Sequence, residues 1–184
     1  MKSLCSTVTL LSVIALSGPA MAEDWVYMPA FKPGWEPDFT LAAVGGALDV
    51  DHAGSGFYSG VELSLNCPWF QPPTGQVRQQ FNIGTYDDDM EITSFELNPN
   101  YFMTLSPGVT FGVGPGVGYA RASYRNGPTE GLWSVQASAN LNYRSGSLFL
   151  GAGARYQDTR DKTLAPGVRG ADNWLLSAKV GINF

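Results

Sequence analysis

Cysteine is scarce in this chain of 184 residues, which contains only Cys5 and Cys67. Cys5 lies in an N-terminal segment that we expect to be removed, so Cys67 is then the single cysteine. A disulfide within one chain needs two cysteines, and a metal site built on cysteine also needs more than one. The sequence therefore excludes both and leaves stability to packing and backbone pairing. Two interpretations of Cys67 stay open: an unpaired structural cysteine, or a thiol that forms a disulfide between two molecules.

Positive charge is also scarce, because 11 lysines and arginines stand against 16 aspartates and glutamates. Removal of the N-terminal segment takes away Lys2 and no acidic residue within that segment, so the mature chain stays acidic. No basic surface is indicated, and we expect no nucleic acid as a partner.

Long apolar runs are missing too. No run after the N-terminal segment reaches about 18 residues, the length that predicts a transmembrane helix. The run at residues 8–16 is shorter, follows Lys2 and precedes the small residues Ala20 and Ala22. This order predicts a secretory signal peptide at residues 1–22.

The rest of the chain falls into two parts. Residues 23–37 alternate prolines with aromatic residues, and we expect a periplasmic N-terminal lead-in there rather than a helix. Residues 38–184 show no helical period, and apolar residues alternate with polar ones as in strands. We predict eight strands, at residues 38–50, 56–66, 76–87, 91–104, 108–122, 131–143, 147–158 and 173–184. The expected fold class is all-β, an eight-stranded antiparallel up-and-down transmembrane β-barrel spanning residues 38–184.

The two faces of these strands favour a membrane barrel over a soluble sandwich. The polar faces carry Gly, Ser, Asn and Gln rather than the Lys and Glu of a water-facing surface, and such small groups suit a narrow interior. The apolar faces end in aromatic residues, as expected at two membrane interfaces. The predicted aromatic girdles are Phe39, Tyr101, Tyr143 and Phe184 at one rim, and Phe57, Phe95, Tyr119, Trp133, Tyr156 and Trp174 at the other.

Three stretches carry a family resemblance. "GVTFGVGPGVGYARA", "SLFLGAGARYQDT" and the terminal "WLLSAKVGINF" resemble the later strands of small outer-membrane β-barrel proteins of the OmpA/OmpX/OmpW-like class. The resemblance implies a location in the outer membrane of a Gram-negative cell. It also implies that the barrel assembly machinery reads the last strand, with Val180, Ile182 and Phe184 as the assembly signal.

Four charged residues share inward parity at membrane depth: Glu62, Glu96, Arg155 and Lys179. Two acids and two bases make a neutral set, and each charge would be costly in a confined interior without a partner. We therefore predict an interior network of ion pairs that fills the lumen. The alternative use of such residues is a path for protons or ions, although eight strands leave little room beyond side chains.

Other motifs offer weaker chemistry. The strict glycine alternation of "GVGPGVG" at residues 112–118 fits neither nucleotide-binding pattern, and indicates inward glycines beside bulky neighbours. Pro115 on the outward face predicts a bulge or weakened pairing. The acidic tip Asp87-Asp88-Asp89 with Glu91 is a solvated turn or a weak divalent-cation site. We expect no cofactor.

Catalysis is not expected either. His52 is the only histidine and has Asp51 and Ser55 nearby, but neighbours in one loop rarely align as a triad. Outer-membrane lipid A deacylases, as the resemblance implies, place a His-x-Ser on a late strand, and this chain has no histidine there.

The expected partners are outer-membrane lipids and lipopolysaccharide, and no oligomeric state is predicted. Five basic residues near the outer rim are placed to meet lipopolysaccharide phosphates: Arg121, Arg125, Arg160, Lys162 and Arg169. The leading function is a structural or surface-interaction role with a plugged interior and short external loops. A barrel that binds or passes small hydrophobic molecules is the alternative, and a lipid A-modifying enzyme is the third candidate.

Overall fold

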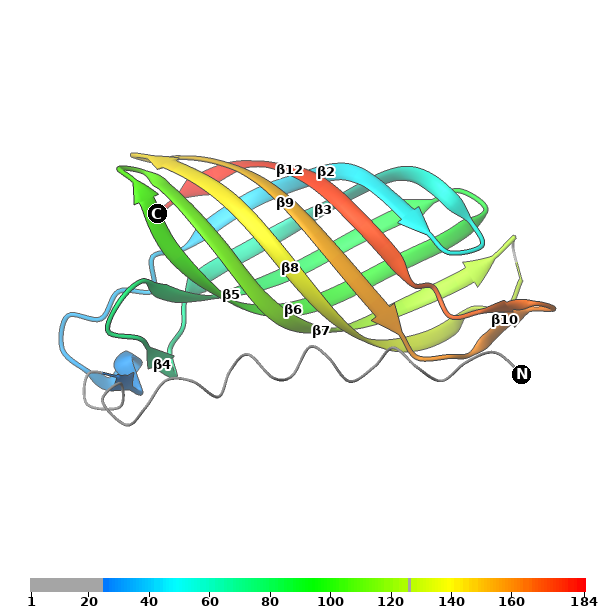
Figure 1. Ribbon diagram of the computed structural model, residues 1–184, viewed down its shortest axis with the longest axis horizontal. Helices are drawn as coiled ribbons and strands as arrows, with labels where there is room; N and C mark the ends of the chain where they lie inside the picture. The colour runs from blue at the N-terminus through cyan, green and yellow to red at the C-terminus, as the bar shows by residue number, and fades with distance from the viewer. Residues whose placement is uncertain (1–24, 126) are drawn as a thin grey trace.

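A computed structural model describes residues 25–125 and 127–184, so the predicted signal peptide lies outside the described residues. Eight antiparallel strands close into a barrel in the order β12-β2-β3-β5-β6-β7-β8-β9 (Figure 1). Their bounds are Thr40–Val50 for β2, Gly54–Asn66 for β3, Gln76–Asp87 for β5, Met90–Ser106 for β6, Val109–Tyr124 for β7, Glu130–Ser145 for β8, Leu148–Thr159 for β9 and Asn173–Asn183 for β12. No helix among the described residues is long and apolar enough to cross a membrane.

The eight predicted strands and the all-β barrel are confirmed, with boundary differences of a few residues. The largest extensions are in β6 and β8, whose cross-strand pairing continues beyond the ends of the alternating pattern. Pairing in a closed barrel is set by the neighbouring strand, because a barrel leaves no free edge. Hydrophobic alternation alone therefore marks the strand centres better than their ends.

The two prolines of β6 and β7 interrupt one ladder. Paired residues run to Leu97↔Val117 and resume in the same register at Tyr101↔Val113, with Pro99 and Pro115 in between. Proline has no N–H to donate to a ladder. The weakened pairing predicted at Pro115 is thus present on the β6 side, whereas the register shift of this pair lies elsewhere, between Thr104 and Ser106.

The barrel has two distinct ends. At the end that we call the terminal end, Phe39 and Phe184 exchange backbone hydrogen bonds of 3.0 Å in both directions and bring β12 against β2. At the opposite end, the loop end, the long β9–β12 connection carries the short strands β10 (Thr163–Ala165) and β11 (Val168–Arg169), as Figure 1 shows. The short turns after β6 and β8 are at the terminal end.

A small additional unit lies at the terminal end. The strand β1 (Val26–Tyr27) pairs with β4 (Phe70–Gln71), and the 3-10 turn η2 (Pro29–Phe31) follows β1. The sequence pattern predicted a lead-in at residues 23–37 and left residues 67–75 as the connection between two strands, but it predicted no pairing between these segments. The pairing joins segments far apart in the chain, which is why local patterns did not reveal it.

Candidate functional site

The four predicted interior charges come together as two ion pairs. The Lys179 ammonium contacts Glu62 Oε2, and the Arg155 guanidinium contacts Glu96 Oε1. All four side chains are buried, on β3, β6, β9 and β12. Each pair is neutral by itself, so the interior holds no uncompensated charge from this set.

Amide and hydroxyl side chains surround the two pairs. Lys179 Nζ also donates to Asn140 Oδ1 at 3.0 Å, and Gln80 Nε2 donates to Glu62 Oε1 at 3.1 Å. Arg155 Nη2 donates to Asn173 Oδ1 at 3.0 Å, and Gln136 Nε2 donates to Glu96 Oε2 at 3.3 Å. These bonds satisfy lone pairs and protons that the ion pairs leave open, which a buried charge requires. Two of them also join strands that are not neighbours in the barrel, β12 with β8 and β8 with β6.

The glycines of β7 make room for this network. A Cβ on Gly116 would overlap Asn98 Oδ1, and a Cβ on Gly112 would overlap the Phe102 ring. Because the glycines have no side chain, Ser138 Oγ of β8 reaches Asn100 Oδ1 of β6 at 3.0 Å, across β7. The structure therefore places the glycines of residues 112–118 toward bulky interior neighbours.

Little empty space remains beside the ion pairs. One cavity of about 30 Å³ lies between the two pairs, lined by polar residues that include Asn82, Ser138 and Ser177. A site needs roughly 10–15 Å³ to hold one water molecule, so this cavity has room for one or two. Asn140 Nδ2 and Arg155 Nε, both from residues that line it, have no hydrogen-bond partner among the described residues.

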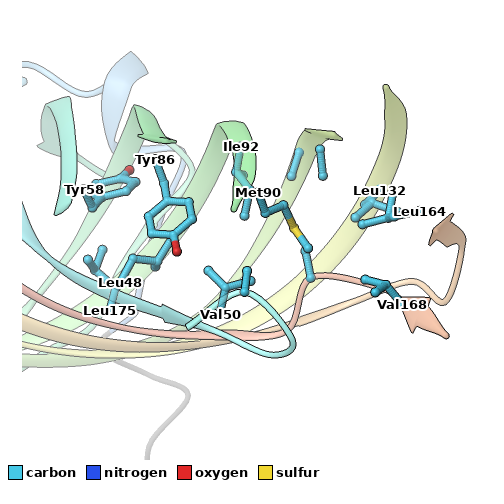
Figure 2. Packing of buried hydrophobic residues seen from close by; sticks show 14 of the residues in the cluster. Leu48, Val50, Tyr58, Tyr86, Met90, Ile92, Leu132, Leu164, Val168 and Leu175 are labelled. Carbon is cyan, nitrogen blue, oxygen red and sulfur yellow. The ribbon is translucent and has the colours of Figure 1, made fainter. Parts of the chain in front are cut away.

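Most of the loop half of the interior is apolar, which the strand alternation did not predict. Tyr86, Met90, Leu132 and their neighbours pack into one cluster inside the wall, and Leu164 and Val168 of the β10–β11 hairpin close its loop end, at the right of Figure 2. We call this cluster the apolar plug: Val44, Leu48, Val50, Ala53, Tyr58, Tyr86, Met90, Ile92, Ala120, Ala122, Leu132, Leu164, Val168, Ala171 and Leu175.

The plug and the ion pairs meet at Tyr58, whose ring centroid lies 5.9 Å from the Arg155 guanidinium carbon. On one side, a strip of polar residues continues from Arg155 toward the loop end. Asn173 Nδ2 donates to Gln157 Oε1 at 2.9 Å, and Gln157 Nε2 donates to Ser134 Oγ at 2.7 Å. The remaining sides of the loop half are filled by the plug.

A second charged cluster closes the terminal end, and it too was missed. Arg78 Nη1 and Arg144 Nη1 both contact Asp38 Oδ2, at 2.7 and 2.5 Å, and Arg78 Nε donates to Ser64 Oγ at 2.9 Å. Partial burial raises the pKa of Asp38, but the hydrogen bond from Arg144 and the charges of both arginines outweigh it and hold the pKa below its ordinary value. The partners lie 40 and 106 residues from Asp38, so no local motif signals them.

The outward surface is apolar and ends in aromatic residues. At the loop side, Tyr119 packs edge-on against Trp133 at 5.2 Å between ring centroids, and Tyr156 packs against Trp174 at 4.9 Å. The predicted girdle residues Phe57 and Phe95 are exposed at the same side. At the terminal end, Phe39 stacks on Phe184 at 5.8 Å. Tyr101 and Tyr143 also lie toward this end, near the turns after β3 and β8.

The terminal strand exposes Val180, Ile182 and Phe184 on the outward face. His52 is exposed in the β2–β3 turn with a left-handed backbone (φ 70°), and no hydrogen bond joins its ring to a serine or carboxylate in the part of the chain that is described. Cys67 is completely buried, and its sulfur accepts a contact from Gln79 Nε2 at 3.5 Å. His52 and the Cys67 thiol thus lie at opposite ends of the barrel.

The acidic tip at residues 87–91 takes part in an ion pair and does not form a metal-binding cluster. Asp89 Oδ2 contacts Arg125 Nη2 at 3.0 Å. Within residues 25–125 and 127–184, no group of three or more histidine, cysteine, aspartate or glutamate side chains is arranged to hold a metal ion. Lys162 pairs with Glu130 at 3.3 Å, whereas Arg121, Arg160 and Arg169 are exposed and form no ion pair among the described residues.

No family model matches this chain, and no curated protein does. Solved structures are similar in fold. The N-terminal β-barrel domain of Pseudomonas aeruginosa OprF has a TM-score of 0.58 at 16% identity, covering 81% of this chain and 100% of that one. Ail, the attachment invasion locus protein of Yersinia pestis, has a TM-score of 0.53 at 13% identity, covering 82% of this chain and 100% of that one. The outer membrane enzyme PagL has a TM-score of 0.51 at 17% identity, covering 78% of this chain and 98% of that one. The chain therefore has the fold of small eight-stranded outer-membrane β-barrels.

Proposed function

We propose that this chain is an integral protein of the Gram-negative outer membrane with a structural or surface-interaction role and a closed interior. The observation that carries the proposal is the inverted distribution of polarity. Charges and amides lie inside the barrel, while the outer wall exposes apolar side chains between aromatic residues at both ends. Contact between such a wall and water would cost much free energy, whereas the hydrocarbon of a bilayer is a suitable surrounding for it.

The filled interior supports a structural role over transport. The cavity between the ion pairs has room for one or two waters, and the loop half is packed with the chain's own side chains. A small hydrophobic molecule would have to displace the apolar plug. We therefore place the binding or passage of such molecules second.

Lipopolysaccharide is the lipid partner that we propose for the outer rim. Arg121 lies on the outward face beside Phe95, and Arg160 lies beside Trp133, so both guanidinium groups sit next to loop-side girdle residues. Guanidinium groups bind phosphate oxygens with two parallel hydrogen bonds. Replacing Arg121, Arg160 and Arg169 by Gln should lower the melting temperature in lipopolysaccharide but not in detergent alone. An equal change in both media would count against this contact.

For biogenesis, we propose the exposed residues Val180, Ile182 and Phe184 as the signal that the barrel assembly machinery reads. We also propose cleavage of residues 1–22 on export. A catalytic role is not part of the proposal, because in the described part of the chain the Ser55 hydroxyl donates to Asp49 and no hydrogen bond joins it to His52. Equal, background-level acyl release from lipopolysaccharide by the wild type and by His52→Ala would agree with this.

Two measurements test the central proposal. Membrane fractionation with a heat-modifiability gel should place the folded chain in the outer membrane, and recovery from the soluble periplasm would refute the class. Planar-bilayer recording of the purified protein should then show no steady, large conductance. A stable open channel would leave the membrane location intact but would disprove the closed interior.

A further inference from the structure

The unit at the terminal end exposes an unusual amount of apolar surface. We call residues 25–35 and 68–71 the platform, since they form β1, η2 and β4 with their connections. Four of its large side chains are exposed to solvent: Phe31 is 82% exposed, Tyr27 64%, Trp69 52% and Met28 48%. Large apolar side chains that are exposed together on one small unit are a signal of a binding surface. None of the functions considered so far uses these residues.

The platform is held in a defined shape. Met28 N donates to Trp69 O at 2.7 Å, next to the β1–β4 pair, and Trp25 packs on Phe70 with 6.1 Å between ring centroids. Gln71 anchors β4 to the barrel, because its Nε2 donates to Val77 O at 2.8 Å and its Oε1 accepts from Val77 N at 2.9 Å. The exposed aromatic residues are therefore presented by a built surface and not by a loose tail.

The platform lies against the outside of the barrel wall. Val77 and Gln79 alternate in β5 with Arg78 and Gln80, whose side chains make hydrogen bonds inside the barrel, so Val77 and Gln79 face outward. Both are nevertheless buried, beneath the segment that contains Cys67 and Gln71. Figure 1 shows η2 and β4 to one side of the wall, at the end where β12 finishes.

The platform also joins the terminal girdle. The hydroxyl of the girdle residue Tyr101 donates to Thr74 O at 3.1 Å, in the connection between β4 and β5. Because Tyr101 is opposite Val77 in the β5–β6 ladder, the platform and the girdle share one stretch of outer wall. The platform thus lies on the same side of the barrel as the girdle residue Tyr101.

Charge gives no hint of an ionic partner. Within residues 25–37 and 67–76 the ionisable side chains other than tyrosine and Cys67 are Lys32 and Glu36, which sum to zero. Aromatic side chains with a polar tip, such as Tyr27 and Trp69, suit the boundary between headgroups and acyl chains. An uncharged aromatic surface beside a lipid-facing wall fits a zwitterionic phospholipid better than an acidic or basic protein.

We propose that the platform is a membrane-interface anchor, whose exposed side chains Tyr27, Met28, Phe31 and Trp69 sit among the phospholipids of the leaflet at the terminal end. The inference rests on the proposed membrane location of the barrel. The anchor widens the interfacial footprint on the β5 side only. It therefore fixes the depth and the tilt of the barrel relative to the bilayer plane.

Depth-dependent quenching of tryptophan fluorescence tests this. A full-length chain that keeps Trp69 but carries Trp→Phe at positions 25, 35, 133 and 174 is reconstituted in phosphatidylcholine vesicles containing lipids brominated near the carbonyl end of the acyl chain. A matched chain that keeps only Trp133 reports insertion of the barrel itself. We expect quenching of Trp69 to the same extent as Trp133. The quenching of Trp69 should not change with salt, since the platform is neutral.

The possible outcomes separate the two proposals. Quenching of Trp133 without quenching of Trp69 overturns the anchor and leaves the membrane barrel standing. That result is expected if the platform docks a periplasmic protein instead. Absence of quenching for both refutes the membrane location and the anchor with it. As a second variant, Tyr27→Ser with Phe31→Ser in the Trp69-only chain should reduce Trp69 quenching. The same pair of changes in the Trp133-only chain should leave Trp133 quenching unchanged, which shows that the barrel still folds.

Discussion

The two halves of the barrel interior are filled by opposite kinds of side chain, polar in one half and apolar in the other. From mid-height toward the terminal end the lumen is filled by the ion pairs Glu62–Lys179 and Glu96–Arg155 with their amide partners. Near the loop end it is filled by the apolar plug beneath the β10–β11 hairpin. Hydrophobic burial is non-directional, whereas ion pairs and hydrogen bonds require defined positions. The polar half therefore specifies which strands face one another, and the apolar half excludes water at low geometric demand.

The largest effect is expected from breaking one ion pair of the polar half. Arg155→Met should destabilise the barrel by about 3–5 kcal/mol, because Glu96 is left as a buried charge without its partner. Urea unfolding in detergent micelles, followed by the loss of heat modifiability, measures this change. Lys179→Met should act similarly through Glu62.

The double variant Glu96→Gln with Arg155→Met sharpens the test. It removes both charges, so most of the lost stability should return, as for other buried pairs that are replaced together. A double variant as unstable as Arg155→Met alone would mean that the guanidinium acts mainly by packing on Tyr58 and by its bond to Asn173.

The apolar half should respond to lost volume instead of lost charge. Leu132 is fully buried in the plug, and Leu132→Ala should cost about 2–5 kcal/mol through lost burial and the cavity left behind. The cost should be the same at high and low salt. A cost that varies strongly with ionic strength would show that the loop half is wet, contrary to the packing in Figure 2.

Glycine replacement compares the inside of the wall with its outside. Gly116→Ala should cost about 1–3 kcal/mol, since its methyl group would overlap Asn98 and force the polar half to shift. Gly45→Ala is the matched control, because a Cβ there meets only the Phe57 ring at 3.6 Å. Thermal unfolding of the two variants in one detergent measures the difference. Equal melting temperatures would contradict the close packing around β7.

The smallest effect is expected at the terminal end and depends on pH. The pKa of Asp38 is lowered in the folded chain, because the hydrogen bond and charges of Arg144 and Arg78 outweigh the effect of burial. Its contribution is therefore complete above the ordinary pKa of about 3.9 and is lost as the pH falls through the lower folded value. Asp38→Asn should flatten the stability profile below about pH 4. An unchanged acid profile would assign the loss of stability to other carboxylates.

Much of the barrel is predictable from sequence, because alternation in a closed antiparallel sheet is a local property. The inward parity of Glu62 and Lys179 was read from neighbours in their own strands, and their meeting in space follows from the narrow lumen. The girdles follow equally from aromatic residues at the ends of apolar faces. Such features need no knowledge of which strand pairs with which.

The apolar plug and the platform were not predicted from the sequence, because they depend on contacts between segments far apart in the chain. Leu132 beside Trp133, and Leu175 between Trp174 and Leu176, make short stretches that are apolar on both faces. Such stretches indicate a strand buried on both sides, and they were the available signal for the plug. The β1–β4 pair and the cluster of Asp38 with Arg78 and Arg144 join distant segments, for which the sequence alone gave no signal.

The gap at Pro99 and Pro115 has a mechanical consequence. Between Leu97↔Val117 and Tyr101↔Val113, β6 and β7 share no backbone pair, and this stretch is bridged by Ser138 of β8 reaching Asn100 over the glycines. Side-chain bridges are more compliant than a ladder of backbone bonds. We therefore expect the wall to be softest at mid-height of this seam, so that stretching or thinning of the bilayer is taken up there first.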